Sequence, residues 1–143
     1  MNFCILTPVL NGGWRLDAAL ASVRAQSHRH WRLVVLDGGS TDGSLAIARR
    51  HAVEDPRIEV RSQPDAGMYD ALRKGFDAEA DHCDLLGWLN ADDLYTPWAF
   101  NEAARAARAG AKWLTGLPAL WDAEGSLRGV LPRCGHARGW AAR

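Results

Sequence analysis

Cysteine is scarce in this chain, long apolar runs are missing, and neither sign of charge is in excess. The three cysteines among 143 residues, Cys4, Cys83 and Cys134, are widely spaced and form no Cys-x-x-Cys pair. This spacing argues against structural zinc and is typical of a reduced, cytosolic chain. Lysine plus arginine and aspartate plus glutamate both total 17. No nucleic-acid partner and no polybasic membrane patch are therefore indicated.

No apolar run approaches the ~20 residues that a transmembrane helix needs, so we expect no transmembrane segment. The first residues, Met-Asn-Phe-Cys-Ile, carry neither a basic leader nor a cleavage site and are not expected to form a signal peptide. These features predict a cytoplasmic protein, either free or peripheral at the inner face of the membrane. The length predicts a single domain, 1–143, with its own hydrophobic core.

Strand and helix patterns alternate along the chain. Strands are predicted at 3–6 (ended by Thr7-Pro8), 31–36, 57–61, 85–90, 112–115 and 117–121, and helices at 16–26, 45–51, 68–76 and 97–109. Gly110 is predicted to terminate the last helix, and residues 122–125 are predicted to form a hairpin turn. Such alternation predicts an α/β domain around a mostly parallel sheet.

Tryptophan is abundant, with seven in the chain. Trp31, Trp88 and Trp113 lie inside predicted strands, so we expect them in the core. Trp98 and Trp121 have the chemistry to stack on a sugar, but no tryptophan is assigned to a site.

The apolar segment 85–89 is followed by Asn90, Ala91 and two adjacent carboxylates, Asp92 and Asp93. Such a run predicts a buried parallel strand, and open α/β sheets bind ligands beyond the C-terminal ends of their strands. Adjacent carboxylates repel unless a cation joins them. Mg²⁺ and Mn²⁺ suit oxygen ligands and often bridge to substrate phosphates. The alternative is that Asp93 caps the helix that starts near Pro97, with Asp92 solvated.

A second acidic strand end is Asp37, which precedes Gly38 and Gly39. A carboxylate there can accept hydrogen bonds from ribose hydroxyls or from a base N–H. A plain strand-to-helix turn is the alternative, and capping of the next helix accounts for Ser40 to Asp42. Capping does not explain why an acid closes the strand, so Asp37 remains a functional candidate.

The same loop, Asp37-x-Gly39-x-Thr41-x-Gly43, resembles the Asp-x-Gly-x-Gly-x-Gly loop of S-adenosylmethionine methyltransferases. Thr41 replaces the middle glycine, which gives the cofactor room. A dinucleotide-binding fold is less favoured, because no Gly-x-Gly-x-x-Gly follows the first strand. Neither alternative accounts for the adjacent acids at 92 and 93.

Taken together, several segments in order resemble a family-two glycosyltransferase of the GT-A fold. The matching segments are Thr7-Pro8 with Asn11, Ser22–Ser27, Leu33–Ser44, Asp65–Ala71 and Leu89–Asp93, with 113–129 similar to the strands that follow. The resemblance implies a GT-A-like, Rossmann-type three-layer sandwich. It also implies a metal-dependent, inverting transfer of sugar from a nucleotide-diphospho-sugar to the hydroxyl of a saccharide or lipid-linked acceptor.

The resemblance implies roles at the matched positions. Asp37 would contact the base or ribose, Asp92 the ribose or donor sugar, and Asp93 a Mn²⁺ or Mg²⁺ ion on the diphosphate. The nucleotide-sugar-binding residues would be Thr7, Pro8, Asp37, Asp70 and Asp92. Asp65 is less defined, and Asp70 either contacts the donor or anchors its loop.

Two departures from the family pattern stand out. Arg73 replaces the usual asparagine, either as a phosphate ligand or as part of a solvated helix face. Inverting transfer needs a general base, which the family supplies well downstream of its Asp-x-Asp motif. After Asp93 only Glu102, Asp122 and Glu124 remain, and none matches. We therefore expect a domain incomplete at its C-terminus, with a non-catalytic nucleotide-sugar-binding module as the alternative.

Overall fold

The computed structural model describes residues 1–116, 119–122 and 126–130. The side chain of Trp121, the predicted turn residues 123–125 with Glu124, and the segment 131–143 lie outside the described residues. The contacts divide the chain into two compact units, Met1–Ala109 and Gly110–Arg143. The single-domain expectation stays a prediction, and the two units are described one at a time.

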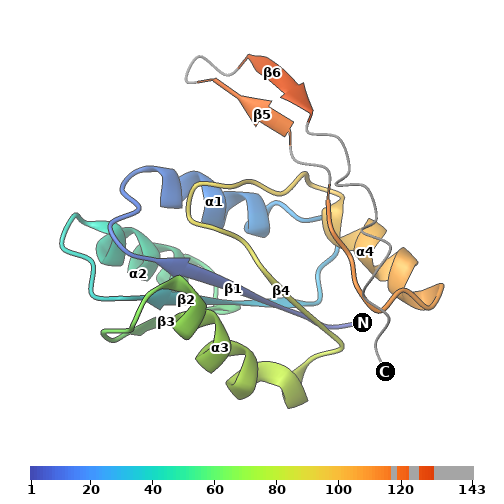
Figure 1. Cartoon of the computed structure of the whole chain (residues 1–143), viewed down its shortest axis with the longest axis horizontal. Helices are drawn as coiled ribbons and strands as arrows, with labels where there is room; N and C mark the ends of the chain where they lie inside the picture. Colours follow the sequence, from blue (N-terminus) through green and yellow to red (C-terminus); the bar gives the residue numbers. More distant parts are fainter. Residues whose placement is uncertain (117–118, 123–125, 131–143) are drawn as a thin grey trace. The chain divides into compact units, whose positions relative to one another are not determined.

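The first unit is built on a four-stranded parallel sheet with the order β3-β2-β1-β4 (Figure 1). Its elements are β1 (Phe3–Val9), α1 (Arg15–Arg24), β2 (Trp31–Asp37), α2 (Ser44–Glu54), β3 (Ile58–Ser62), α3 (Met68–Glu79), the 3₁₀ turn η1 (Ala80–His82), β4 (Leu85–Trp88) and α4 (Ala99–Arg108). The parallel α/β architecture predicted from the sequence is confirmed.

Helices cover both faces of this sheet. Successive side chains of a strand point to opposite faces. On one face, Phe3 and Ile5 of β1 pack with α1, α2 and α4, and the ring of Phe3 stacks on Phe100 at 4.9 Å. On the other face, Cys4 and Leu6 pack with α3. The unit is therefore a three-layer α/β/α sandwich, as the resemblance implied.

The sequence predicted that the first strand ends at Thr7-Pro8. This prediction was wrong, because β1 continues through both residues to Val9. The carbonyl of Leu6 accepts a hydrogen bond from the N–H of Leu89 at 2.9 Å, so even-numbered residues of β1 direct their backbone groups toward β4. Pairing with β4 ends at Trp88. The missing N–H of Pro8 therefore falls beyond the ladder and interrupts no strand pairing.

The fourth strand is shorter and less buried than predicted. It ends at Trp88 rather than Asn90 and lies at the edge of the four-stranded sheet. Leu86 and Trp88 are 39% and 42% exposed, because β4 has a partner strand on one side only. The prediction that Trp88 lies in the core was wrong, whereas Trp31 is buried as predicted.

The second unit contains an antiparallel pair, β5 (Ala119–Trp121) and β6 (Leu127–Val130). The strand predicted at 112–115 is absent, and Trp113 is 76% exposed rather than buried. Gly110, which follows α4, has a φ of 93° and so supplies the left-handed residue predicted at the helix end. Among the described residues, no helix combines the length and apolarity that crossing a membrane requires.

Candidate functional site

The loops that follow β1, β2, β3 and β4 meet at the C-terminal edge of the sheet, where parallel α/β folds bind ligands. The first two of these loops are tied together by Asn11, which has a φ of 55°. Its N–H donates to Ser40 Oγ at 2.9 Å, and its Oδ1 accepts the N–H of Thr41 at 2.9 Å. Asparagine is among the few residues that tolerate this backbone conformation.

Asp42 completes the link between these loops. Its Oδ1 accepts the N–H of Ser44 at 3.0 Å at the start of α2, and its Oδ2 accepts the N–H of Gly13 at 2.8 Å. The N-cap of α2 is Gly43, which forms no side-chain cap, so the expected capping by Ser40 to Asp42 is wrong; Asp42 instead binds the first N–H of the helix from one residue before the cap. Ser40 and Thr41 bind Asn11. The segment from Ser40 to Asp42 therefore holds the loop after β2 against the loop after β1.

The loop after β4 rests directly on the loop after β1. A Cβ on Gly12 would lie 2.9 Å from Val9 Cγ2 and 3.2 Å from Ala91 Cβ. Only glycine lets the two loops approach this closely. The contact brings Asp92 and Asp93 to the same edge of the sheet as the Asn11 and Asp42 loops.

Asp37 ends β2 as a buried carboxylate, only 1% exposed. It accepts hydrogen bonds from Ser62 Oγ at 2.7 Å and from the N–H groups of Ser40 at 3.2 Å and Gly39 at 3.3 Å. Burial raises the pKa of Asp37, but the hydrogen bonds from Ser40 and Ser62 lower it by more, so the pKa lies below its usual value. Asp37 is therefore an ionised acceptor at neutral pH.

A cavity of about 170 Å³ opens beside Asp37, between the ends of β2 and β3 and the helix α3. Its residues are Leu36, Asp37, Arg61, Gln63, Asp65, Ala71, Lys74, Gly75 and Ala78. A Cβ on Gly38 would lie 3.0 Å from Asp65 Oδ2, so glycine there lets the Asp65 carboxylate approach the strand end. The cavity thus combines two carboxylates with two cationic side chains and a small apolar wall.

Sequence reasoning did not single out Arg61, Gln63 or Lys74 as members of the site. Gln63 immediately follows β3, whose end adjoins the end of β2, so the strand-end rule that selected Asp37 also applies to it. Lys74 follows the expected phosphate candidate Arg73. Arg73 instead pairs with Asp70 at 3.2 Å and Asp77 at 3.4 Å, which is the solvated helix face named as the alternative.

Asp70 is held by its own helix and loop. Its Oδ2 accepts from Lys74 Nζ at 2.5 Å and from the N–H of Ala66 at 3.1 Å. The Lys74 ammonium is the main cause that lowers the pKa of Asp70 to about 2. This geometry supports the loop-anchoring alternative, and a contact with the donor stays a prediction.

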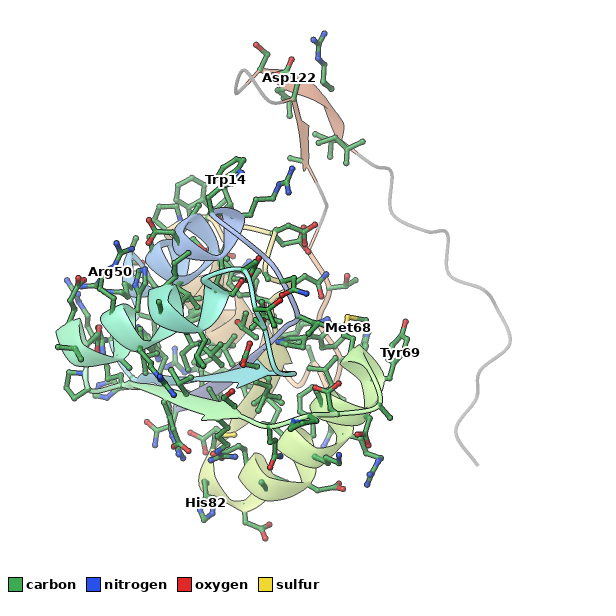
Figure 2. The ribbon with its side chains drawn as sticks, turned by 90° about the vertical axis from the view of Figure 1, so that its left-hand side faces the viewer. Trp14, Arg50, Met68, Tyr69, His82 and Asp122 are labelled. Atoms are coloured by element: carbon green, nitrogen blue, oxygen red, sulfur yellow. The ribbon has the colours of Figure 1, made fainter. Side chains whose placement is uncertain are left out.

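Met68 and Tyr69 project outward from the first turn of α3 (Figure 2), and Tyr69 is 81% exposed.

Thr7 and Pro8 are adjacent and buried, and by the two-residue alternation their side chains lie on opposite faces of the sheet. Neither contributes to the cavity beside Asp37. Thr7 is fully buried, and its Oγ1 has no hydrogen-bond partner in the described part of the chain. Their expected roles in donor binding stay predictions.

Asp92 and Asp93 are both exposed. The alternative role of Asp93 as a cap of the next helix was wrong, because α4 begins at Ala99 and has no side-chain cap. The side chain of Gln26, which lies far away in the sequence, binds the first turn of that helix instead. Its Oε1 accepts the N–H of Phe100 at 3.1 Å, and its Nε2 donates to the carbonyl of Thr96 at 2.8 Å. Asp93 is therefore free of a capping duty.

Oxygen ligands at Asp92 and Asp93 fit Mg²⁺ or Mn²⁺, which bind through one or two carboxylates plus substrate phosphates. Within 1–116, 119–122 and 126–130, no three or more His, Cys, Asp or Glu side chains are grouped to hold a metal ion. A cation at this edge would accordingly share its ligands between the protein and a bound diphosphate. The residues fit a metal of that kind rather than a permanent, all-protein site.

The candidate general bases are engaged elsewhere. Glu102 on α4 pairs with Arg105 at 2.6 Å. In the second unit, Asp122 pairs with Arg128 at 2.6 Å and accepts the N–H of Ser126 at 2.7 Å. Glu124 lies outside the described residues. No general base is therefore identified in the part of the chain that the structure describes.

Comparison with known proteins gives a family match over most of the chain. Residues 4–118 match the family model described as "Glycosyl transferase family 2". A relative from Mycobacterium bovis, named PGL/p-HBAD biosynthesis glycosyltransferase, is 38% identical over 92 residues, which are 64% of this chain and 35% of the relative. The alignment thus spans about a third of the relative's length.

Solved structures share the fold. S. aureus TarS, in complex with UDP-GlcNAc, has a TM-score of 0.69 at 18% sequence identity. The match covers 76% of this chain and 32% of the TarS chain. Mannosyltransferase PcManGT from Pyrobaculum calidifontis, in complex with GDP-Man and Mn²⁺, has a TM-score of 0.66 at 18% sequence identity. The match covers 85% of this chain and 36% of the PcManGT chain. These likenesses confirm the predicted GT-A-like fold class.

Proposed function

The chain belongs to glycosyltransferase family 2, and from this membership we propose that it binds a nucleotide-diphospho-sugar donor for metal-dependent, inverting transfer to an acceptor hydroxyl. One observation carries the proposal. The ionised Asp37 and the exposed pair Asp92 and Asp93 lie at the same edge of one parallel sheet. A nucleotide diphosphate has a hydrogen-bonding end and an anionic end, and these acids suit the two ends.

The buried Asp37 would accept hydrogen bonds from the base or the ribose. Its position is set before binding by Ser62 and the Ser40 N–H, so little reorganisation is needed. The cavity beside it offers Gln63 and Lys74 as further polar contacts. We assign the nucleoside to this cavity.

The exposed Asp93 would hold Mn²⁺ or Mg²⁺ against the diphosphate, with Asp92 turned to the ribose or donor sugar. The bound cation would stabilise the negative charge that develops on the departing diphosphate. The complex of PcManGT with GDP-Man and Mn²⁺ supports a divalent cation in this fold. Asp93 itself contributes a fixed anionic oxygen at the strand edge.

The acceptor is proposed to be a saccharide or a lipid-linked saccharide. We propose a cytoplasmic site of action, with peripheral contact at the inner face of the membrane for a lipid-linked acceptor. Cys4 and Cys83, the cysteines within the described residues, are unpaired, which supports the reducing compartment. The S-adenosylmethionine alternative is set aside, because family membership explains the Asp37 loop together with the acids at 92 and 93.

A second candidate function is donor binding without transfer. It is favoured by one observation, the absence of an identified general base in the described residues. Both candidates require donor binding, so one experiment tests their common part. Titration calorimetry with UDP, GDP and TDP, with and without Mn²⁺, should give Mn²⁺-dependent binding of at least one nucleotide. If none of the three binds in the presence of Mn²⁺, the proposed function is wrong.

A further inference from the structure

Asn90 lies between the end of β4 and the two acids of the site. Its side-chain Nδ2 donates a hydrogen bond to Asp93 Oδ2 at 2.8 Å. Its carbonyl oxygen accepts the N–H of Asp93 at 3.2 Å. One residue thus binds both the backbone and the carboxylate of Asp93, which closes the turn and restricts the carboxylate to one direction.

The orientation of the Asn90 amide is set by the Asp93 carboxylate. Its Oδ1 is buried and has no hydrogen-bond partner among the described residues. Flipping the amide would place this oxygen against the Asp93 carboxylate, where two acceptors would face each other. The carboxylate therefore determines the orientation.

The backbone of this loop does not depend on the amide. Ala91 rests on the Gly12 loop, with 3.2 Å between its Cβ and a Cβ built on Gly12. Tyr95 donates its hydroxyl to the carbonyl of Trp88 at 2.8 Å, and its N–H donates to Ser22 Oγ at 3.2 Å. The loop is therefore held on both sides of Asp93. Removing the Asn90 amide should release the carboxylate and leave the chain path intact.

We infer that Asn90 is a positioning residue that orients Asp93 for the divalent cation of the donor complex. This inference rests on the proposed function. With Oδ2 held by Asn90, Asp93 Oδ1 is left to bind the cation. Groups that hold a metal ligand in place commonly change metal affinity by about 10–100-fold when they are removed. Asn90 acts through Asp93 and needs no contact of its own with the cation.

The test compares the parent with Asn90→Ala and with Asn101→Ala as the matched control. Asn101 is exposed where Asn90 is half-buried, and it likewise donates through Nδ2, but to Ser27 Oγ at 2.8 Å rather than to a residue of the site. Calorimetry measures binding of the nucleotide diphosphate that the parent prefers, with and without Mn²⁺. Asn90→Ala should weaken binding about 10–100-fold with Mn²⁺ and leave metal-free binding unchanged. Asn101→Ala should match the parent in both conditions.

A double-mutant cycle with Asp93→Asn separates positioning from a general structural effect. If Asn90 acts through Asp93, then Asn90→Ala should weaken Mn²⁺-dependent binding no further in the Asp93→Asn background. Equal losses with and without Mn²⁺, or unchanged binding in Asn90→Ala, would overturn the inference alone. If the parent binds no nucleotide diphosphate with Mn²⁺, the proposed function fails as well. Thermal unfolding monitors folding, and Asn90→Ser replaces Asn90→Ala if the latter does not fold.

Discussion

Ser62 Oγ donates to Asp37 Oδ2 at 2.7 Å, and this bond joins the ends of β2 and β3 at the point where the cavity opens. The bond links fold and site. It completes the set of donors that keeps the buried Asp37 carboxylate ionised. It also fixes the direction of a buried anionic acceptor in the wall of the cavity.

Asp37→Ala should reduce nucleoside diphosphate affinity with or without Mn²⁺. The loss of one charged hydrogen bond corresponds to about 1–3 kcal/mol of binding free energy. Calorimetry in both metal conditions measures the change. Ser62→Ala is the matched control, since it removes one donor to Asp37 and keeps the carboxylate, and it should lose less affinity. Unchanged affinity in Asp37→Ala would remove Asp37 from the nucleoside site.

Asp93→Asn should weaken binding only when Mn²⁺ is present, because the amide keeps the shape of the side chain and lacks the charge. Asp93 is exposed, so its replacement should leave the unfolding temperature near that of the parent. The measurement is the ratio of nucleotide affinities with and without Mn²⁺. If both Asp37→Ala and Asp93→Asn bind the nucleotide with Mn²⁺ as the parent does, the site assignment is wrong while the fold stands.

Gly12→Ala should destabilise the fold and weaken Mn²⁺-dependent binding together. The new Cβ would lie 2.9 Å from Val9 Cγ2 and 3.2 Å from Ala91 Cβ. Overpacking of this kind typically costs about 1–3 kcal/mol, and relief requires that the loop with Asp92 and Asp93 moves away. Denaturant unfolding and calorimetry measure the two effects. Gly116→Ala is the control, because a Cβ there meets nothing within 4 Å.

The stability of the fold should fall in acid through Asp37 and Asp70. Both carboxyl groups have a lowered pKa in the folded state, about 2 for Asp70, against an ordinary value of 3.8. Their contribution is fully present above the unfolded pKa, and it is lost as the pH falls from about 4 through the folded values. Asp37→Asn should unfold more readily at neutral pH and show a shallower loss below pH ~4. Parallel pH profiles for parent and variant would contradict this.

Much of the fold and the site could be predicted from local patterns. The β2 range and the Gly110 helix end follow from apolar runs and helix-stop chemistry, which act within a few residues. The exposure of Trp88 could not be predicted, because it depends on which strand occupies the sheet edge. That order is a long-range property.

The same distinction applies inside the site. Asp37 and the acids at 92 and 93 were found because each follows a strand, a feature visible in sequence. Gln26 could not be assigned, since its partners Thr96 and Phe100 lie about 70 positions away. The membership of Arg61 and Lys74 in the cavity likewise depends on how closely α3 approaches the sheet.

The last prediction concerns transfer itself. Glu102 is paired with Arg105, Asp122 with Arg128, and the described residues provide no other candidate base after Asp93. General-base help is typically worth ~10²–10⁴-fold in rate. We therefore expect this 143-residue chain to show at most slow donor hydrolysis and little transfer. A turnover assay with labelled nucleotide-sugars and a broad acceptor panel, run beside Asp93→Asn, measures both reactions.

Transfer at ordinary enzymatic rates would mean that the base lies within the chain. Glu102→Gln, Asp122→Asn and Glu124→Gln would then identify it, as the variant that loses transfer and keeps Mn²⁺-dependent nucleotide binding.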